Sequence, residues 1–295
     1  MLAKLYRKIV PVNLRNILYK WFVGRLVFFL RNFKIIMAGK LIYLTRFLWP
    51  DNDKFNSLAF IGKYGLSSYP GEYALLYRNF PVEVFFDNER ALNFVVHNGR
   101  QLYFTSKLDV PTIKKLYTSL VIEQDPESPH KYIDDETLLQ DKILLDIGSA
   151  EGIFTLDNIE HIKKAYIFES EDFWIDALKA TFEPWKEKVE IVQKYIGKDN
   201  NENTITIDSF LVDKEKSNFF FKMDIEGAEY EALMGAKNTL SNCDNILASI
   251  CTYHHERDPD RINAFMSELG FSTTFTKGYL YWGKRLNKAI LRCKK

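Results

Sequence analysis

The first 50 residues of this chain contain no aspartate and no glutamate, although ten lysines and arginines lie among them. The whole chain has 40 basic and 39 acidic residues, so residues 51–295 carry 30 basic and 39 acidic groups and a net charge of −9. A basic, aromatic-rich arm therefore precedes an acidic body. Because the acidic body would repel phosphate, nucleic acid is not the expected partner of the arm.

Long apolar runs are also absent from the arm. Its longest uncharged run is 9–14, whereas a membrane-spanning helix needs about 20 mostly apolar residues. No small-residue cleavage site follows an apolar core, as a signal peptide would require. Residues 21–31 have the composition of a segment that lies in the membrane interface, with arginine and lysine drawn to anionic lipid. Their charges do not fall on one helical face, so helices packed on the main domain or on a second subunit are the alternative.

Cysteine is scarce. The three cysteines, Cys243, Cys251 and Cys293, are odd in number and lack the spacing of a metal site. This pattern favours a reducing compartment. We therefore expect a cytoplasmic protein, peripheral on the inner membrane face if the arm binds lipid.

Two common nucleotide-binding patterns are missing. The chain has neither the Gly-x-Gly-x-x-Gly of NAD sites nor the Gly-x-x-x-x-Gly-Lys-Ser/Thr of ATPases, which argues against an NAD-dependent epimerase or dehydrogenase. The pattern that is present is Asp146-x-Gly148-x-x-x-Gly152, after the apolar run 143–145. It indicates a strand, a glycine turn and a helix start, where the backbone can approach a ligand. The turn predicts a nucleotide-like cofactor, with a plain tight turn as the alternative.

The sequence divides into three regions. Residues 1–50 form the arm, which we expect to be helical, and residues 51–140 form a small β-rich and helical accessory region that ends in a polar lead-in loop. Within it, His97-Asn98-Gly99-Arg100 is typical of a two-residue hairpin. Residues 141–295 form the main domain. In the accessory region, the expected strands are 81–86, 91–96 and 100–104, and a helix is expected at about 111–120.

From residue 141 onward, strand and helix patterns alternate, which is typical of an α/β fold with a mostly parallel sheet. Two β-prone runs near the end, 271–276 and 279–282, flank Lys277-Gly278 and predict an antiparallel hairpin. The expected strands are 143–147, 165–169, 189–193, 219–224 and 246–250, and the expected helices are 172–184, 228–240 and 258–269.

Acidic side chains end two of the expected strands. Glu169 ends the second strand, where a carboxylate can bind both hydroxyls of a ribose. Asp224 ends an aromatic strand and is followed closely by Glu226 and Glu229. Ligands of open α/β sheets lie at the carboxyl ends of the strands, so Asp224 is a candidate site residue, with a helix cap as the alternative. Three acids this close together repel one another unless a cation is near.

Two adjacent histidines, His254 and His255, follow the next expected strand, at the edge of the sheet where Asp224 also lies. A neutral imidazole has a pKa suited to removing a hydroxyl proton near neutral pH. Either histidine is therefore a candidate catalytic base, with Asp224 orienting the imidazole or the acceptor.

Together these residues resemble the FkbM-type, S-adenosylmethionine-dependent methyltransferases. The most specific match is 222–229, Lys-Met-Asp-Ile-Glu-Gly-Ala-Glu, and 206–210, 233–236 and the ending from Tyr253 to Tyr279 are also similar to the family. The resemblance covers about 143–282. The lead-in 123–130 resembles members found with bacterial surface-glycan genes.

The resemblance implies a Rossmann-like class I methyltransferase sheet and O-methylation of a sugar hydroxyl in surface-glycan biosynthesis. By position it places Glu169 at the cofactor ribose and Asp224 beside the methyl group, with His254 or His255 as the base. The turn departs from the family at Glu151, which adds a negative charge near the cofactor carboxylate. The residues implied to contact the methionine part of S-adenosylmethionine are Asp146, Gly148, Ser149 and Gly152.

Two alternatives stay open. Asp224 could hold a divalent cation that acidifies the acceptor hydroxyl, although no metal-ligand spacing requires one. The chain could also be a catalytically inactive binding or scaffold protein tethered by its arm. Glu151 favours that reading, whereas the intact Asp224-Ile225-Glu226-Gly227 argues against it.

Overall fold

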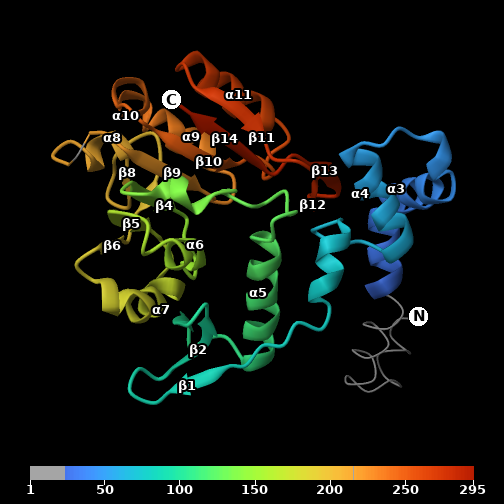
Figure 1. The fold of residues 1–295 in the computed structure, drawn as a ribbon, viewed down its shortest axis with the longest axis horizontal. Coiled ribbons are helices and arrows are strands. Elements are labelled where there is room, and N and C mark those ends of the chain that lie inside the picture. Colours follow the sequence, from blue (N-terminus) through green and yellow to red (C-terminus); the bar gives the residue numbers. More distant parts are fainter. Residues whose placement is uncertain (1–23, 215) are drawn as a thin grey trace, which may run out of the picture.

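The computed structural model describes residues 24–214 and 216–295, and a seven-stranded sheet forms its centre (Figure 1). The strand order is β11-β14-β10-β9-β4-β5-β6. Five strands are parallel, and β14 is antiparallel to both of its neighbours. The strands are β4 (Ile143–Ile147), β5 (Lys164–Phe168), β6 (Val189–Val192), β9 (Phe219–Met223), β10 (Leu247–Cys251), β11 (Ser272–Phe275) and β14 (Ile290–Lys294).

Helices cover both faces of this sheet (Figure 1). Successive side chains of a strand point to opposite faces, so Leu144 belongs to one hydrophobic core and Leu145 to the other. Since both faces are buried, the parallel strands are almost continuously apolar. The first core contains side chains of α5 (Val110–Glu123), α6 (Ile153–Asp157) and α7 (Asp172–Phe182), and the second those of α8 (Ile207–Phe210), α9 (Glu229–Met234), α10 (Lys237–Asn242) and α11 (Asp258–Glu268).

A three-stranded antiparallel sheet precedes the main sheet. It consists of β1 (Phe85–Asp87), β2 (Leu92–His97) and β3 (Arg100–Phe104). Asn98 and Gly99 both have positive φ angles, 49° and 80°, as a type I′ turn requires, so the predicted hairpin is confirmed. The N–H of Tyr103 donates to Thr181 Oγ1 of α7 at 3.0 Å, and His97 Nε2 lies 2.7 Å from Asp157 Oδ1. These contacts hold the small sheet against the first helix layer.

The described part of the arm contains α3 (Gly24–Leu44), which packs against α4 (Asp53–Tyr64) of the accessory region, beside the body (Figure 1). The two helices touch backbone to backbone, because a Cβ placed on Gly62 would lie 2.2 Å from the carbonyl oxygen of Gly39. The N–H of Gly278 donates to Asp53 Oδ2 at 2.9 Å. The arm residues 1–23, with half of its basic side chains, lie outside the described residues.

Two further pairs of short strands complete the architecture. β12 (Leu280–Trp282) pairs with β13 (Arg285–Asn287), and β7 (Tyr195–Ile196) pairs with β8 (Thr204–Ile205). The β12–β13 hairpin lies between the arm and the main sheet (Figure 1). Among residues 24–214 and 216–295, the remaining elements are four short 3-10 helices, η2 (Arg46–Leu48), η3 (Glu72–Tyr77), η4 (Glu136–Leu139) and η5 (Glu183–Trp185).

The predicted fold class is confirmed: the main domain is a Rossmann-like α/β sheet of the class I methyltransferase type, mostly parallel and antiparallel at its C-terminal end. Two details differ from the predictions. The helix expected at 228–240 is two helices, which separate at Gly235 where the backbone of Gly197 approaches too closely for any Cβ. The runs 271–276 and 279–282 do not pair with each other, because β11 pairs with β14 and β12 with β13.

Candidate active site

A cleft of about 600 Å³ opens at the carboxyl ends of β4, β5 and β9. The chain continues from β4 to a helix on one face and from β9 to a helix on the other, and ligands of open α/β sheets bind at this kind of switch point. The turn 147–151, the segment 168–171, α5 and β12 contribute to its walls. Two other hollows, of about 560 and 770 Å³, contain none of the predicted site residues.

Gly148 joins the glycine turn to the end of β9. Its φ angle is +76°, and a Cβ placed on it would lie 1.9 Å from the carbonyl oxygen of Asp224. Only glycine fits this position, both for its conformation and for its space. The close approach brings the cofactor turn and Asp224 together in one cleft, as the sequence predicts.

The structure corrects the predicted role of Asp146. Its side chain is fully buried beneath the turn and is absent from the cleft wall. Oδ2 accepts the hydroxyl of Thr155 at 2.6 Å, and Oδ1 lies 3.0 Å from Nζ of Lys222. Lys222 also donates to the carbonyl oxygen of Gly148. Asp146 therefore supports the turn from below through a buried ion pair rather than by meeting a ligand.

Gly152 also has a packing role. It is the residue before α6, with a φ angle of +81°, and a Cβ there would lie 2.8 Å from side-chain carbons of Leu178 and Phe182. It does not line the cleft. Gly152 thus lets α6 pack on α7, and the cofactor contact expected for it stays a prediction.

Three of the predicted cofactor residues line the cleft, Gly148, Ser149 and Glu169, and the last two bring polar side chains to it. Glu169 follows β5, and its carboxylate accepts the N–H of Ala150 at 3.0 Å and of Glu171 at 2.8 Å. Burial raises the pKa of Glu169, although both N–H donors oppose the shift. The hydroxyl of Ser149 is buried in the same wall and has no hydrogen-bond partner among the described residues. Both groups are therefore available to a polar ligand.

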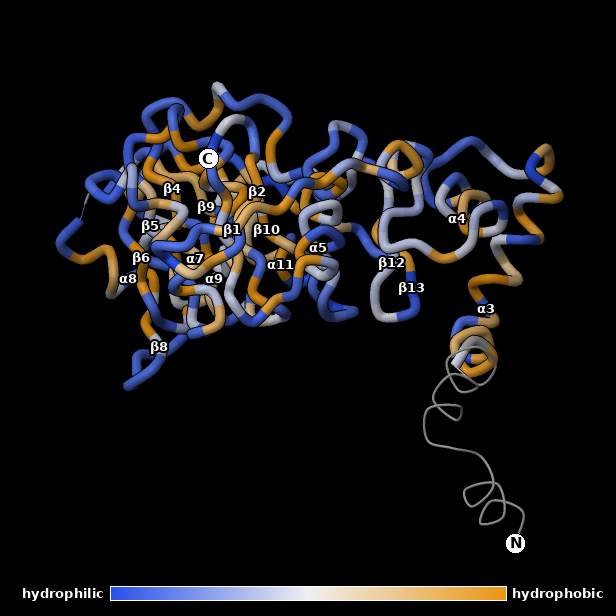
Figure 2. Tube along the Cα trace, turned by 90° about the horizontal axis from the view of Figure 1, so that it is seen from below, coloured by the Kyte–Doolittle hydropathy of each residue, from blue (hydrophilic) through white to orange (hydrophobic). Residues whose placement is uncertain are grey.

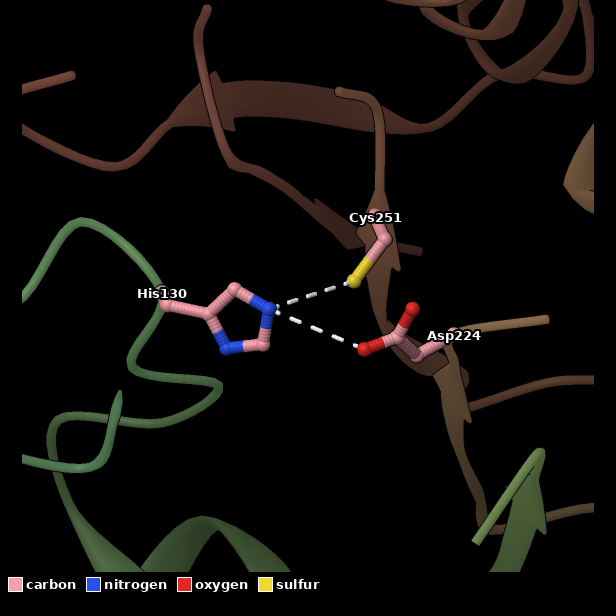
Figure 3. Close-up of side chains that lie close together, drawn as sticks. All are labelled: His130, Asp224 and Cys251. Carbon is pink, nitrogen blue, oxygen red and sulfur yellow. Dashed lines mark hydrogen bonds and ion pairs between the residues drawn. The ribbon is translucent and has the colours of Figure 1, made fainter. Parts of the chain in front are cut away.

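Asp224 lines the cleft and is the centre of a polar cluster, of which Figure 3 shows His130 and Cys251. Tyr132 donates its hydroxyl to Oδ2 at 3.0 Å, and Nε2 of His130 lies 3.6 Å from the same oxygen. Nε2 of His254 lies 3.5 Å from Oδ1. Burial acts to raise the pKa of Asp224, but His130, Lys222 and His254 outweigh it, so the pKa lies below its ordinary value. Asp224 is thus an ionised carboxylate that faces the cleft.

The two adjacent histidines have different surroundings. Nδ1 of His254 lies 2.9 Å from Oε1 of Glu229, which also accepts the backbone N–H of Ile225 at 3.0 Å. Burial lowers the pKa of His254, but Glu229, Asp224 and Glu226 together outweigh it, and the net pKa is above the ordinary value. His255 is exposed and packs over Gly227 instead. The structure therefore places His254, and not His255, beside Asp224.

His130 is the site residue that the sequence reasoning missed. Its side chain is 3% exposed, Nε2 lies 3.1 Å from the hydroxyl of Tyr253, and Nδ1 lies 4.0 Å from Oε2 of Glu123. Figure 3 shows that its imidazole points from the lead-in loop toward Asp224 and Cys251. The sequence signal for His130 was the lead-in 123–130, which resembles the family. This segment has no strand or helix pattern, so the sequence did not predict where it lies relative to the sheet.

Two sets of side chains hold ligand atoms close enough together for a metal ion, His130-Asp224-Cys251 and Asp224-Glu229-His254. Burial raises the pKa of the Cys251 thiol well above its ordinary value, which disfavours the thiolate that a metal requires. In the second set, Glu229 already accepts backbone N–H groups. Within the second set, Oε2 of Glu229 and both ring nitrogens of His254 are buried without a hydrogen-bond partner among the described residues. The divalent cation stays a prediction.

Comparison with known proteins agrees with this arrangement. Residues 103–273 match the sequence model of the family described as the methyltransferase FkbM domain. Among curated proteins, no sequence matches the chain.

Solved structures with similar folds include three methyltransferases. The chain is 16% identical to the methyltransferase FkbM of Methylobacillus flagellatus KT, covering 63% of this chain and 55% of that one, with a TM-score of 0.42. The chain is 11% identical to magnesium protoporphyrin IX methyltransferase of Synechocystis PCC 6803, covering 64% of this chain and 86% of that one, with a TM-score of 0.43. The third structure is a putative tRNA (m1A22) methyltransferase of Streptococcus pneumoniae in complex with S-adenosyl-L-methionine. It is 18% identical to this chain, and the match covers 53% of this chain and 67% of that one, with a TM-score of 0.37. This chain thus spans just over half the length of the Methylobacillus protein.

Proposed function

This chain belongs to the FkbM methyltransferase family, and we propose that it transfers the methyl group of S-adenosylmethionine to a hydroxyl group of a sugar-containing acceptor. One observation carries this proposal. The backbone of Gly148, in the cofactor turn, is in contact with the backbone of Asp224, the centre of the polar cluster. A cofactor at the turn and a hydroxyl at Asp224 are therefore neighbours in one cleft, as methyl transfer requires.

The groups in the cleft wall fit this cofactor. Glu169 offers a carboxylate to the ribose hydroxyls, and the free hydroxyl of Ser149 offers a hydrogen bond to the methionine carboxylate. Gly148 leaves room for the backbone of the turn to approach the ligand. When bound, S-adenosylmethionine supplies a methyl group activated by the positive charge on its sulfur.

The protein then has to orient the acceptor hydroxyl and remove its proton. Asp224 accepts a hydrogen bond from that hydroxyl, because it is the ionised group of the cluster that faces the cleft. Asp224 would accept the proton of that hydroxyl, and the bound cofactor would supply the methyl group that replaces it. The imidazole of His254, 3.5 Å from Oδ1, then takes the proton and is itself oriented by Glu229.

A sugar is the acceptor that the outer cleft suits. Tyr69 and Trp282 line the cleft with aromatic side chains, and the residue Trp282 is 44% exposed. Tyr253 lines it beside Asp224. Apolar walls with a few convergent polar groups are typical of small-molecule sites. The resemblance to members found with surface-glycan genes supports the same class of acceptor.

The arm is the second part of the proposal, and we assign it to an anionic membrane surface. No helix among the described residues is long and apolar enough to cross a bilayer. Figure 2 shows hydrophobic residues along α3, although it lies at the edge of the molecule. Exposed Arg31, Lys34 and Lys40 lie on the same helix, and lysine and arginine are attracted to anionic lipid. The exposed apolar side chains of α3 are Leu26, Phe28, Phe29, Leu30, Phe33, Met37, Leu41, Tyr43 and Leu44.

Two experiments test the methyltransferase proposal. In calorimetry, the full chain should bind S-adenosylmethionine and S-adenosylhomocysteine, and the absence of both interactions would refute it. Asp224→Ala should bind the cofactor as the wild type does but should not restore methylation to the surface glycan of a strain that lacks the gene. Mass spectrometry of that glycan measures the lost methyl group, and full restoration by Asp224→Ala would remove Asp224 from the mechanism.

A further inference from the structure

Glu151 is a buried carboxyl group in the wall of the cleft, in the turn between β4 and α6. Its side chain lines the cleft beside Gly148 and Ser149, and the residue is 4% exposed. Among the described residues, only its own backbone N–H donates to the carboxyl group. Burying an acidic side chain without a partner costs free energy. A functional role for Glu151 would explain why the protein bears this cost.

The charged groups around Glu151 do not supply a partner. Glu123 faces it from α5 and Asp146 from β4, and both are acids. Lys222 of β9 is the nearby cation, but its Nζ lies 3.0 Å from Asp146 Oδ1 and donates to Gly148. Glu169 faces the same cleft from the end of β5 and is also an acid. The other lysine of the cleft wall, Lys194, donates to the carbonyl oxygen of Glu202. Both lysines of the described cleft wall therefore have other partners, and neither forms an ion pair with Glu151.

Burial accordingly raises the pKa of Glu151 to about 8, and Glu123 adds to the shift while Lys222 opposes it. Without a ligand, the side chain is a neutral carboxylic acid at pH 7. Before a ligand binds, the side chain of Glu151 therefore adds no negative charge to the turn.

We propose that Glu151 is the counter-ion of the α-ammonium group of the cofactor and that its proton is released when the cofactor binds. The proposal rests on the proposed function, which places the methionine end of the cofactor at this turn. The balance is simple: the carboxylic acid and the ammonium ion become an ion pair of carboxylate and ammonium, and one proton leaves to solvent. Ser149, whose buried hydroxyl is unpartnered, is left to meet the cofactor carboxylate.

This arrangement makes cofactor affinity depend on pH. Below a pH of about 8, binding must remove a proton from Glu151, so affinity rises as the pH rises toward that value. Between pH 6.5 and 7.5, the rise should approach about tenfold, the limit for release of one proton per cofactor bound. S-adenosylhomocysteine carries the ammonium group but lacks the charged sulfur, so it should show the same dependence.

The test is calorimetric titration of the full chain at pH 7 with each of the two ligands. Each titration is run in phosphate and in Tris, whose heats of ionisation differ, so that the difference in observed heat counts the protons released. The variant Glu151→Gln replaces a neutral acid by a neutral amide of nearly the same shape, and it should therefore fold. Glu171→Gln, an exposed carboxylate in the same cleft wall, is the matched control.

We expect close to one proton released per ligand in the wild type and in Glu171→Gln, and none in Glu151→Gln. Binding without proton release in the wild type would overturn the proposal and leave the methyltransferase function standing. Release with S-adenosylmethionine alone would also overturn it, because the charged sulfur and not the ammonium would then be the partner. Failure to bind either ligand would remove the proposed function itself, and this inference with it.

Discussion

The imidazole of His130 lies 3.6 Å from the carboxylate of Asp224, although one comes from the loop before the main sheet and the other from the end of β9. With His254 on the other oxygen, the carboxylate lies between two imidazoles. The loop thus completes a cluster whose other members belong to the sheet domain. His130 is a positioning residue, because it acts on the acceptor through Asp224.

The first prediction concerns this residue. His130→Gln should lower methylation of the surface glycan more than tenfold, because Asp224 loses one of the groups that hold it ionised. Cofactor affinity measured by calorimetry should stay within about twofold. A purely structural role would instead lower the melting temperature and cofactor affinity together.

The second prediction separates the two adjacent histidines. With glycan extract from the deletion strain as acceptor, His254→Gln should reduce turnover by about 10²- to 10⁴-fold, the usual contribution of a catalytic base. His255→Gln, the matched control, should retain activity because its side chain is exposed and lies away from Asp224. Equal losses in the two variants would contradict the assignment.

The third prediction is a pH profile. Glu229 raises the pKa of His254 above 6.5, and a base works only when it is deprotonated, so activity should rise with pH above that value. In Glu229→Gln the amide oxygen can still accept the N–H of Ile225, but the charge is lost. The rising limb should therefore move to lower pH in this variant, and an unchanged profile would exclude His254 as the titrating group.

The fourth prediction concerns the turn. Gly148→Ala should abolish cofactor binding, because its Cβ would collide with the carbonyl oxygen of Asp224. Gly99→Ala is the matched control, since Gly99 also has a positive φ but no atom within 4 Å of the added Cβ. The control should cost about 1 kcal/mol of stability and should bind the cofactor normally.

The fifth prediction tests the buried ion pair. Lys222→Met should lower the free energy of unfolding by about 3–5 kcal/mol, because Asp146 remains buried without its partner. Adding Asp146→Asn should recover part of that loss in urea denaturation. Lys164→Met breaks an exposed pair with Glu190 and should cost less than about 1 kcal/mol.

The arm gives a matched test of membrane binding. The full chain should sediment with vesicles that contain anionic lipid and should remain in solution with zwitterionic vesicles. Leu30→Glu, on the exposed surface of α3, should reduce this binding, whereas Val212→Glu, an exposed apolar residue next to α8, should not. Binding that is indifferent to Leu30→Glu would favour a second subunit as the partner of the arm.

Much of the fold follows from local patterns. The strands expected at 143–147 and 189–193 end within one residue of β4 and β6. A short apolar run bounded by turn residues predicts a strand without any knowledge of the segments that pack against it. β14 had no such signal, since Arg292 interrupts its short apolar run. β14 pairs with both β10 and β11, so the hairpin expected between 271–276 and 279–282 does not form. Local patterns miss this because the partner of a strand depends on residues far away in the chain.

By itself, the sequence determined the α/β class, the glycine turn and the acidic ends of two strands, because these features depend on neighbours along the chain. It also located Asp224 at the site. Only the tertiary structure decided that Asp146 lies beneath the turn, that His254 and not His255 meets Asp224, and that His130 joins them. The physical reason is that burial and side-chain direction come from packing between distant segments. The same packing buries Glu151 in the cleft wall, near the acids Glu123 and Asp146 and the cation Lys222.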